Sequence, residues 1–299
     1  MPSLGLQRTP SLKDFPSGSS INYKAGKLYL IGDDANEVLI LDVNYRQLDS
    51  LRIFDLPEKR IPKPAKADTE ASTLIEIKGE EFLCVIGSAS TENRKVVILI
   101  PLLPSGLFNK NTPVQVMDDK VFIERLLKAG IPEINIEGLT IMKDKMIMGN
   151  RGNRTHTSSH LIFTEKEFWN RQTACSVVLS ELMLPEKNKG LSGVSGLCCV
   201  ESKDLLLFIA SSETTGNSYE DGAIGDSYLC WINTISRKIH QPAIRADGII
   251  NLSDYNESFR REKIEGLCVE NINGDALALH LVSDNDKGES KLFDASLFL

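Results

Sequence analysis

One pattern recurs five times along this chain, and it limits the folds that the chain can adopt. Each copy begins with Ser or Glu beside a small residue and continues through an apolar segment, a tight turn, a second apolar segment and a polar loop. Self-similarity at such periods is typical of repeat architectures, in which each copy is one supersecondary unit. The copies cover residues 19–42, 70–100, 137–163, 195–232 and 265–293.

The apolar segments of each copy are predicted to form antiparallel strands. Ala25-Gly26, Lys78-Gly79 and Asn273-Gly274 supply residues that tolerate the positive φ of two-residue hairpin loops. A third apolar run follows each polar loop, and the spacing of the copies leaves room for a fourth strand. Radial repetition of such sheets makes a β-propeller. We therefore predict an all-β fold, a five-bladed β-propeller with four-stranded blades, over residues 18–299.

Two other all-β architectures are alternatives to the propeller. A sandwich or barrel also has many short strands, but neither needs the same type of first residue in every copy. A propeller with six blades is a further alternative.

Two segments and the N-terminus do not follow the strand pattern. Residues 118–132 are predicted to form a short helix between blades two and three, because Asp precedes an apolar periodic run that Gly130 and Pro132 end. Residues 252–263 are a second candidate helix. Residues 1–17 are expected to form an N-terminal arm or to close the ring by pairing with the last blade.

Composition restricts the class of partner. The chain has 34 basic and 41 acidic residues, a formal net charge of −7, and no basic stripe, so nucleic acid is not an expected partner. No apolar stretch reaches the roughly 20 residues of a membrane-spanning helix, and no signal peptide is recognisable. We expect a soluble, cytoplasmic monomer, or a secreted or periplasmic one if a leader was removed. The six cysteines lack CxxC spacing and are expected to be reduced and buried.

The first residue of each copy would stand where the innermost strand of a blade enters the central channel. Carboxylates that face one another across a narrow channel repel, so either their pKa values rise or a cation binds. Oxygen ligands without His or Cys suit Ca²⁺. The alternative is that each side chain only hydrogen-bonds to backbone at the start of its strand. The predicted ring consists of Ser19, Glu70, Glu137, Ser195 and Glu265.

The polar loops that follow the second strands should open on the same face as this ring. Aspartates there could act as general bases if burial raises their pKa, and arginines could clamp an anionic group. The alternative for the Asp pairs is solvated turn residues. The catalytic candidates are Asp33, Asp34, Arg151, Arg154, Asp284 and Asp286. The ligand-binding candidates are Asn150, Asn153, Ser211, Glu213 and Asn285.

The charge of these loops bears on the ligand. They contain ten acidic residues against three basic ones, which suits a neutral or cationic small molecule, or further metal ions, better than a strongly anionic substrate. His156 and His160 are weaker candidates as ligands or proton carriers, because their surroundings indicate a loop. His280, between two leucines, is expected to pack between blades.

The order Ser, Glu, Glu, Ser, Glu, one per blade, resembles that of the calcium-activated nucleotidases, the apyrase family of five-bladed propellers. Residues 26–42 are similar to that family's first-blade "GKLY…DD" segment, and residues 263–269 to its last-blade "YEGI" segment. The resemblance implies that the five ring residues hold an axial Ca²⁺. Two features depart from the family pattern: Ala35 stands where an Arg is usual, and only Arg151 and Arg154 match its third-blade arginine motif.

The "EGL" starts and "SDND" ending also resemble the phytase-like esterase propellers and their bacterial relatives. These resemblances imply a calcium-dependent hydrolase of phosphate esters, phosphate anhydrides or other esters. The first alternative is a non-catalytic scaffold in which the ion stiffens the ring and the 210–227 loop binds a partner. A lactonase-type propeller, which uses a similar axial metal, is the second.

Overall fold

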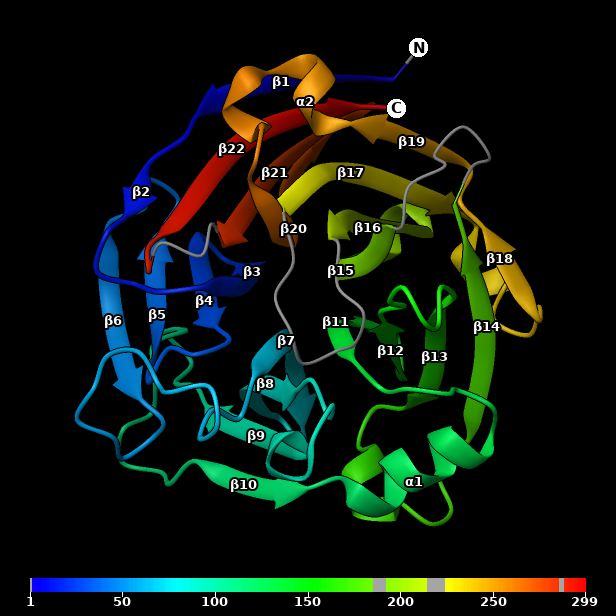
Figure 1. The fold of residues 1–299 in the computed structure, drawn as a ribbon. Coiled ribbons are helices and arrows are strands. Elements are labelled where there is room, and N and C mark those ends of the chain that lie inside the picture. Colours follow the sequence, from blue (N-terminus) through cyan, green and yellow to red (C-terminus); the bar gives the residue numbers. More distant parts are fainter. Residues whose placement is uncertain (1, 185–191, 214–223, 285–287) are drawn as a thin grey trace.

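The computed structural model describes residues 2–184, 192–213, 224–284 and 288–299. The described residues form five sheets arranged in a ring, each with four antiparallel strands as its basic unit (Figure 1). The predicted five-bladed propeller is therefore confirmed. Neighbouring contacts join the innermost strands of the blades in a closed circle around the axis. Those inner strands are β3, β7, β11, β15 and β20.

The blades follow the chain order, and the first three are built from consecutive strands. Blade one contains β3 (Gly18–Lys24), β4 (Lys27–Gly32), β5 (Glu37–Asp42) and β6 (Gln47–Arg52). Blade two contains β7 (Thr69–Ile77), β8 (Glu80–Gly87), β9 (Val96–Pro101) and β10 (Gln115–Asp118). Blade three contains β11 (Ile136–Met142), β12 (Lys145–Asn150), β13 (Ser159–Glu165) and β14 (Val177–Met183).

The last two blades include strands from more distant parts of the chain. Blade four contains β15 (Ser192–Val200), β16 (Leu205–Glu213), β17 (Ile224–Asn233) and β19 (Gly248–Asn251). The short β18 (Ala243–Arg245) instead adds a parallel strand to β14 of blade three. Blade five contains β20 (Lys263–Asn273), β21 (Ala276–Asp284), β22 (Ser290–Phe298) and β1 (Ser3–Arg8), and β2 (Ser11–Leu12) also pairs with β22.

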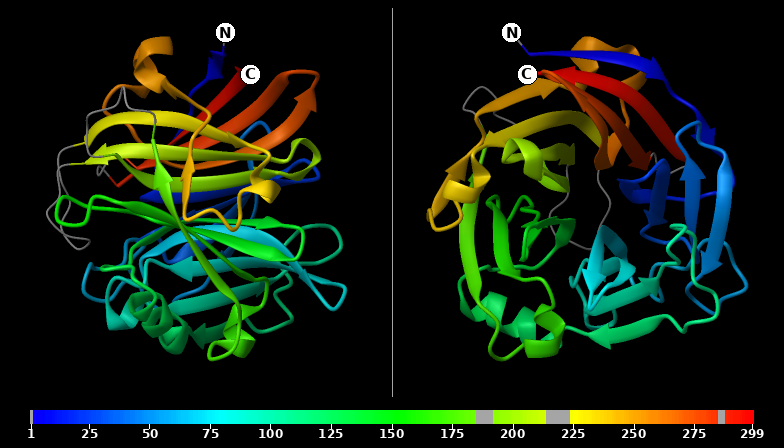
Figure 2. Two further views of the ribbon diagram at one scale, coloured as in Figure 1. Left: turned by 90° about the vertical axis from the view of Figure 1, so that its right-hand side faces the viewer. Right: turned by 180° about the vertical axis from the view of Figure 1, so that it is seen from behind.

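The N-terminal segment closes the ring. Strand β1 pairs antiparallel with β22, with Ser3 opposite Phe298 and Leu6 opposite Ala295, so both ends of the chain lie on one blade (Figure 2). Arg8 strengthens the joint through an ion pair of 2.8 Å with Asp294. Residues 1–17 were expected to form either an arm or a strand that closes the ring, and the pairing of β1 with β22 matches ring closure.

Apolar residues fill the spaces between consecutive blades, and one buried cluster lies at each interface. At the joint between blades five and one, for example, Leu28 and Leu30 pack with Val282 and Leu292. Burial of apolar surface is the main source of stability in such a core. Each blade is thus held by its two neighbours.

The helices are short and lie between blades. Helix α1 (Lys120–Lys128) falls inside the predicted 118–132 segment and buries Phe122 and Leu126 against the interface of blades two and three. Within 252–263 the only helical elements are the four-residue α2 (Leu252–Tyr255) and a 3₁₀ turn, and the range ends at the first residue of β20. The 3₁₀ turns are Glu92–Arg94, Phe168–Arg171, Glu201–Lys203, Ile235–Arg237 and Glu257–Phe259.

No helix among the described residues is long and apolar enough to cross a membrane.

All six cysteines are free thiols. Cys198 and Cys199 are half-buried and the other four are buried.

Candidate functional site

The five predicted ring residues share one backbone feature. In every blade the pairing between the first and second strands skips one residue of the first strand, as when Thr69 faces Gly87 and Ala71 faces Ile86. Such a β-bulge leaves one residue out of the ladder and redirects its side chain. The skipped residues are Ser19, Glu70, Glu137, Ser195 and Glu265. The sequence repeat therefore coincides with a repeated bulge at the start of each inner strand, which we call the upper mouth of the channel.

The two ring serines connect neighbouring blades. Ser19 Oγ donates a hydrogen bond of 2.7 Å to the carbonyl of Thr69, and Ser195 Oγ donates one of 2.8 Å to the carbonyl of Ile264. Each acceptor belongs to the next blade and immediately precedes a ring glutamate. The serines thus bond to backbone, but as donors across a blade interface rather than as acceptors at their own strand.

Two ring glutamates are paired with cations. Glu137 Oε2 lies 2.6 Å from the Arg151 guanidinium, and its Oε1 accepts a hydrogen bond of 2.7 Å from Asn135. Glu265 Oε1 lies 2.7 Å from the Lys263 ammonium. Burial raises the pKa of Glu265 well above its usual range, although Lys263 opposes this shift. Arg151 also donates to Ser211 Oγ at 3.2 Å and to its carbonyl at 3.1 Å, which ties blade three to blade four.

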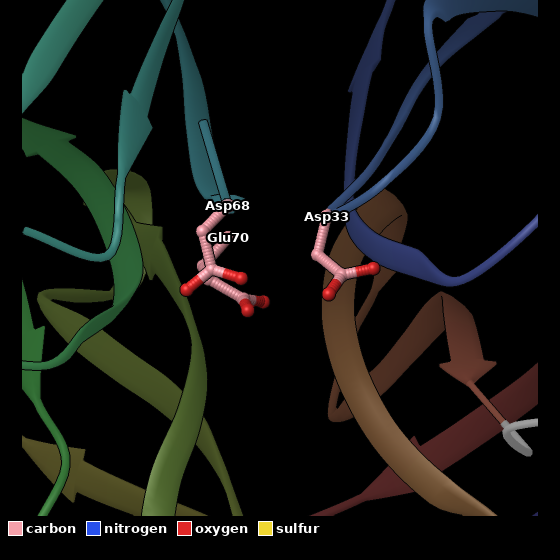
Figure 3. Close-up of side chains that lie close together, drawn as sticks. All are labelled: Asp33, Asp68 and Glu70. Carbon is pink, nitrogen blue, oxygen red and sulfur yellow. The ribbon is translucent and has the colours of Figure 1, made fainter. Parts of the chain in front are cut away.

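The third ring glutamate belongs to a different group, which we call the acidic cluster: Asp33, Asp68 and Glu70. One carboxylate oxygen from each lies within 4.8 Å of the others. Figure 3 shows Asp68 and Glu70 on one side and Asp33 facing them from the other. Asp68 stands two residues before the bulged Glu70, and Asp33 follows β4, which returns to the upper mouth.

Two buried cations contact the cluster unevenly. Lys66 Nζ is paired with Asp33 and lies 2.6 Å from Asp68 Oδ1. Asp68 Oδ2 lies 2.6 Å from Arg94 and accepts a hydrogen bond of 2.5 Å from Ser88 Oγ. Among the described residues, none donates a hydrogen bond or forms an ion pair to the Glu70 carboxylate. Glu70 is therefore the member whose charge the surrounding protein compensates least.

The pKa values follow from this environment. Burial raises the pKa of Asp33 to about 7, against the lowering effect of Lys66. Burial also raises the pKa of Glu70 well above its usual range, and repulsion from Asp68 and Asp33 adds to the shift. For Lys66, burial opposes the charge, but Asp33 and Asp68 outweigh it and raise the pKa of the ammonium. The site therefore combines a permanent cation with carboxyl groups that can exchange protons near neutral pH.

The predicted loop residues divide between this site and structural contacts. Asp34 is buried and turned toward the 53–68 loop, where its Oδ2 lies 2.5 Å from Arg60 Nε. Asn150 bonds to the backbone of Asn135 and Glu133, at 2.8 and 3.2 Å, and so shapes the segment before β11. These contacts separate Asp34 from its neighbour Asp33, which alone joins the acidic cluster.

Three further candidates have different surroundings. Asn153 donates to Glu133 Oε2 at 2.8 Å and accepts from Thr155 N at 2.9 Å, which closes a turn. Arg154 is exposed. Asp284 is buried at the end of β21, opposite Lys263 in the ladder. Asn285, Asp286 and the side chain of Glu213 lie outside the described residues.

Asp68 was not among the predicted site residues, although the sequence contains a signal for it. The signal is a polar residue two positions before a ring residue. The residues at these positions are Ser17, Asp68, Asn135, Gly193 and Lys263. Polar side chains only two positions from a ring residue are close enough along the chain to contact it. Asn135 and Lys263 do contact their ring glutamates. No comparable signal marks Lys66 or Arg94, which come from a loop and a 3₁₀ turn.

Solved structures of other proteins are similar to this chain in fold. The crystal structure of Myxococcus xanthus glutaminyl cyclase is similar, with a TM-score of 0.54 and 11% identity over 99% of this chain and 96% of that one. An exo-1,5-α-L-arabinanase from a bovine ruminal metagenomic library has a TM-score of 0.51 and 13% identity over 95% of this chain and 92% of that one. At these identities the likeness establishes the fold alone. No curated protein matches. A family of unknown function, DUF6929, matches residues 14–297, and the chain therefore belongs to that family.

Proposed function

We propose that this chain is a hydrolase whose active site is the acidic cluster at the upper mouth, with Ca²⁺ as its cation and an uncharged ester as its substrate class. The observation that carries the proposal is the convergence of three carboxylates within 4.8 Å, one of which, Glu70, receives no hydrogen bond or ion pair from the described residues. Perturbed carboxyl groups that converge in this way are typical of catalytic and metal-binding sites.

The cluster offers ligands of the type that Ca²⁺ prefers. Asp33, Asp68 and Glu70 would hold the ion, and Asp33 Oδ1 is buried without a hydrogen-bond partner among the described residues. Lys66 and Arg94 supply two positive charges against three carboxylates, so one negative charge remains when all three are ionised. When bound, the ion would polarise a substrate oxygen or a water molecule. Calcium ligation by all five ring residues stays a prediction. Four of the five contact protein groups, and these contacts would compete with such ligation.

The two carboxyl groups with raised pKa values would have different roles. Burial raises the pKa of Glu70 while no ion is bound, so Ca²⁺ would bind there in competition with protons. Asp33, whose pKa burial raises to about 7, could accept a proton from the attacking water. Lys66 and Arg94 form direct ion pairs with Asp68.

The arginines favour an uncharged substrate over a phosphate ester. Arg151 is committed to Glu137 and Ser211, and Arg154 is exposed, so these two do not form a ready clamp for an anionic group. An apyrase-like reaction on phosphate anhydrides would need such a clamp. We therefore rank carboxylic esters and lactones above phosphoesters.

Calorimetry and activity assays test this proposal together. Protein treated with EGTA is titrated with Ca²⁺ and then assayed on neutral esters, lactones and phosphoesters. We expect Glu70→Gln to weaken the Ca²⁺ heat and to abolish turnover. Glu76→Gln, at an exposed position of the same strand, is the matched control and should behave as wild type. Identical Ca²⁺ responses of the two variants, or turnover that is indifferent to EGTA, would refute the proposal.

A non-catalytic scaffold is the second candidate, and the contacts between blades favour it. Ser19, Ser195 and Arg151 all join neighbouring blades at the upper mouth. On this alternative, Ca²⁺ would raise the melting temperature without any turnover on the panel.

A further inference from the structure

The opposite end of the channel contains a separate cavity of about 800 Å³, which we call the lower cavity. Residues from all five inner strands, β3, β7, β11, β15 and β20, line it. On β7, the lining residue Leu74 comes four positions after Glu70, which places it about 13 Å farther along the strand. The volume lies within the range of about 300 to 1,000 Å³ that is usual for small-molecule sites. The lower cavity is thus distinct from the acidic cluster.

Each charged side chain of its wall has one polar contact, but among the described residues only Lys24 is paired with an opposite charge. Lys24 forms an ion pair with Glu81. Glu201 Oε1 accepts a hydrogen bond of 2.6 Å from the backbone N–H of Lys143. Glu270 Oε2 lies 2.9 Å from His280 Nε2. The cation of the wall, Lys24, already has a carboxylate partner, so an anionic ligand would lose its hydration without gaining an unpaired opposite charge, which is costly. The wall therefore disfavours an anion.

Glu270 contacts His280, and His280 contacts Tyr45 on the side away from the cavity. His280 is fully buried, and its Nδ1 lies 2.7 Å from the hydroxyl of Tyr45. One arrangement of protons satisfies all three side chains: the Tyr45 hydroxyl donates to His280 Nδ1, and His280 Nε2–H donates to Glu270 Oε2. This network fixes the carboxylate on the cavity wall. Among the described residues, no donor reaches the second oxygen, Oε1, which can therefore accept a hydrogen bond from a ligand.

The rest of the wall combines hydroxyl groups with apolar side chains. Thr140 Oγ1 accepts a hydrogen bond of 3.0 Å from the backbone of Cys199, so its hydroxyl proton is available to a ligand. Thr73 adds a second hydroxyl. Leu74, Ile141 and Leu197 supply apolar surface. Such a mixture is typical of sites for amphipathic small molecules.

We propose that the lower cavity binds an organic molecule without negative charge, whose hydroxyl, amide or ammonium group donates to Glu270 while an apolar body packs against the leucine and isoleucine side chains. The site is independent of the acidic cluster, and it would remain if the proposed hydrolase activity were refuted.

Saturation-transfer NMR on the full chain tests this inference with four probes of one skeleton. Benzyl alcohol, benzamide and benzylammonium represent the proposed class, and benzoate is the anionic counterpart. We expect the three donor probes to bind and benzoate to bind at least about ten-fold more weakly, because its charge finds no unpaired cation. Glu270→Gln should weaken the neutral probes roughly ten-fold through the loss of a charged acceptor.

A pair of tryptophan variants locates the binding. Asn271→Trp introduces a large side chain at an exposed lining position and should abolish probe binding. Asn273→Trp, two residues farther along β20 and outside the lining, should leave it unchanged. Equal binding by both variants would overturn the assignment to the lower cavity. Binding of benzoate as strong as that of benzyl alcohol would overturn the proposed class, and absence of binding by all four probes would overturn the site.

Discussion

The two ends of the channel are built from the same five strands, yet their chemistry differs. At the upper mouth each inner strand begins with a bulged residue, and the site gathers Asp33, Asp68 and Glu70 with buried cations. At the lower end each charged side chain of the wall has one partner, and hydroxyl and apolar groups fill the remainder. The comparison shows that the strands supply a frame, whereas the bulges and returning loops determine where charge accumulates.

This difference has an energetic consequence. Buried charges depend on their partners, because removing one member of a pair leaves an uncompensated charge in a medium of low polarity. The ion pair at the lower end, between Lys24 and Glu81, is 47% and 33% exposed, and exposed pairs contribute little to stability. Substitutions at the upper mouth should therefore have the larger effects on stability.

The largest effect is expected for Arg94→Met. Arg94 and Asp68 are almost fully buried, with side-chain exposures of 2% and 5%, and the substitution leaves Asp68 with less compensation. We expect the free energy of unfolding to fall by about 3 to 5 kcal/mol. Urea denaturation at pH 7 would measure it.

Arg171→Met is the matched control, since Arg171 pairs with Glu165 at 2.9 Å but is 61% exposed. Its loss should be under about 1 kcal/mol. Equal losses in the two variants would contradict the view that burial makes the upper mouth sensitive.

The second prediction concerns pH. Burial raises the folded-state pKa of Glu70, so between its unfolded and folded pKa values the folded chain binds more protons than the unfolded chain. Stability is then fully present below the unfolded pKa and is lost as pH rises toward the folded value. In EGTA, Glu70→Gln should flatten this decline by up to about 1.4 kcal/mol per pH unit. Melting curves from pH 4 to 8 would show it. A wild-type slope that Glu76→Gln flattens equally would argue against a role for Glu70.

The sequence predicted the fold and the ring positions because both depend on a repeated pattern. A repeat of five hairpins specifies the blades, and Glu70 was found because Glu137 and Glu265 recur in phase with it. The partners were not predictable in the same way. Lys66 reaches Asp33 from a separate loop, and that contact exists only once the chain is folded. Asp34 points away from the acidic cluster because it pairs with Arg60, which lies in the same 53–68 loop as Lys66.

The third prediction addresses the support behind the lower cavity. Tyr45→Phe removes the hydroxyl that contacts His280 and leaves a buried ring nitrogen unpaired. We expect a loss of about 1 to 3 kcal/mol, the cost of an unsatisfied buried polar group. Tyr255→Phe, at a tyrosine that is 40% exposed and bonds to the Pro2 carbonyl, should cost much less. A loss after Tyr45→Phe as large as that of Arg94→Met would remove the predicted contrast between the two ends.

The smallest effects are expected for the ring serines, and they bear on how calcium would bind. Ser19→Ala and Ser195→Ala each remove one buried hydrogen bond between blades and should each cost about 1 kcal/mol. The two bonds lie at different interfaces, so in EGTA their costs should add in the double variant. If the acidic cluster holds Ca²⁺, the costs should still add when Ca²⁺ is present. If all five ring residues hold one axial ion, both serines share that ligand, and the double variant should depart from additivity by more than about 0.5 kcal/mol.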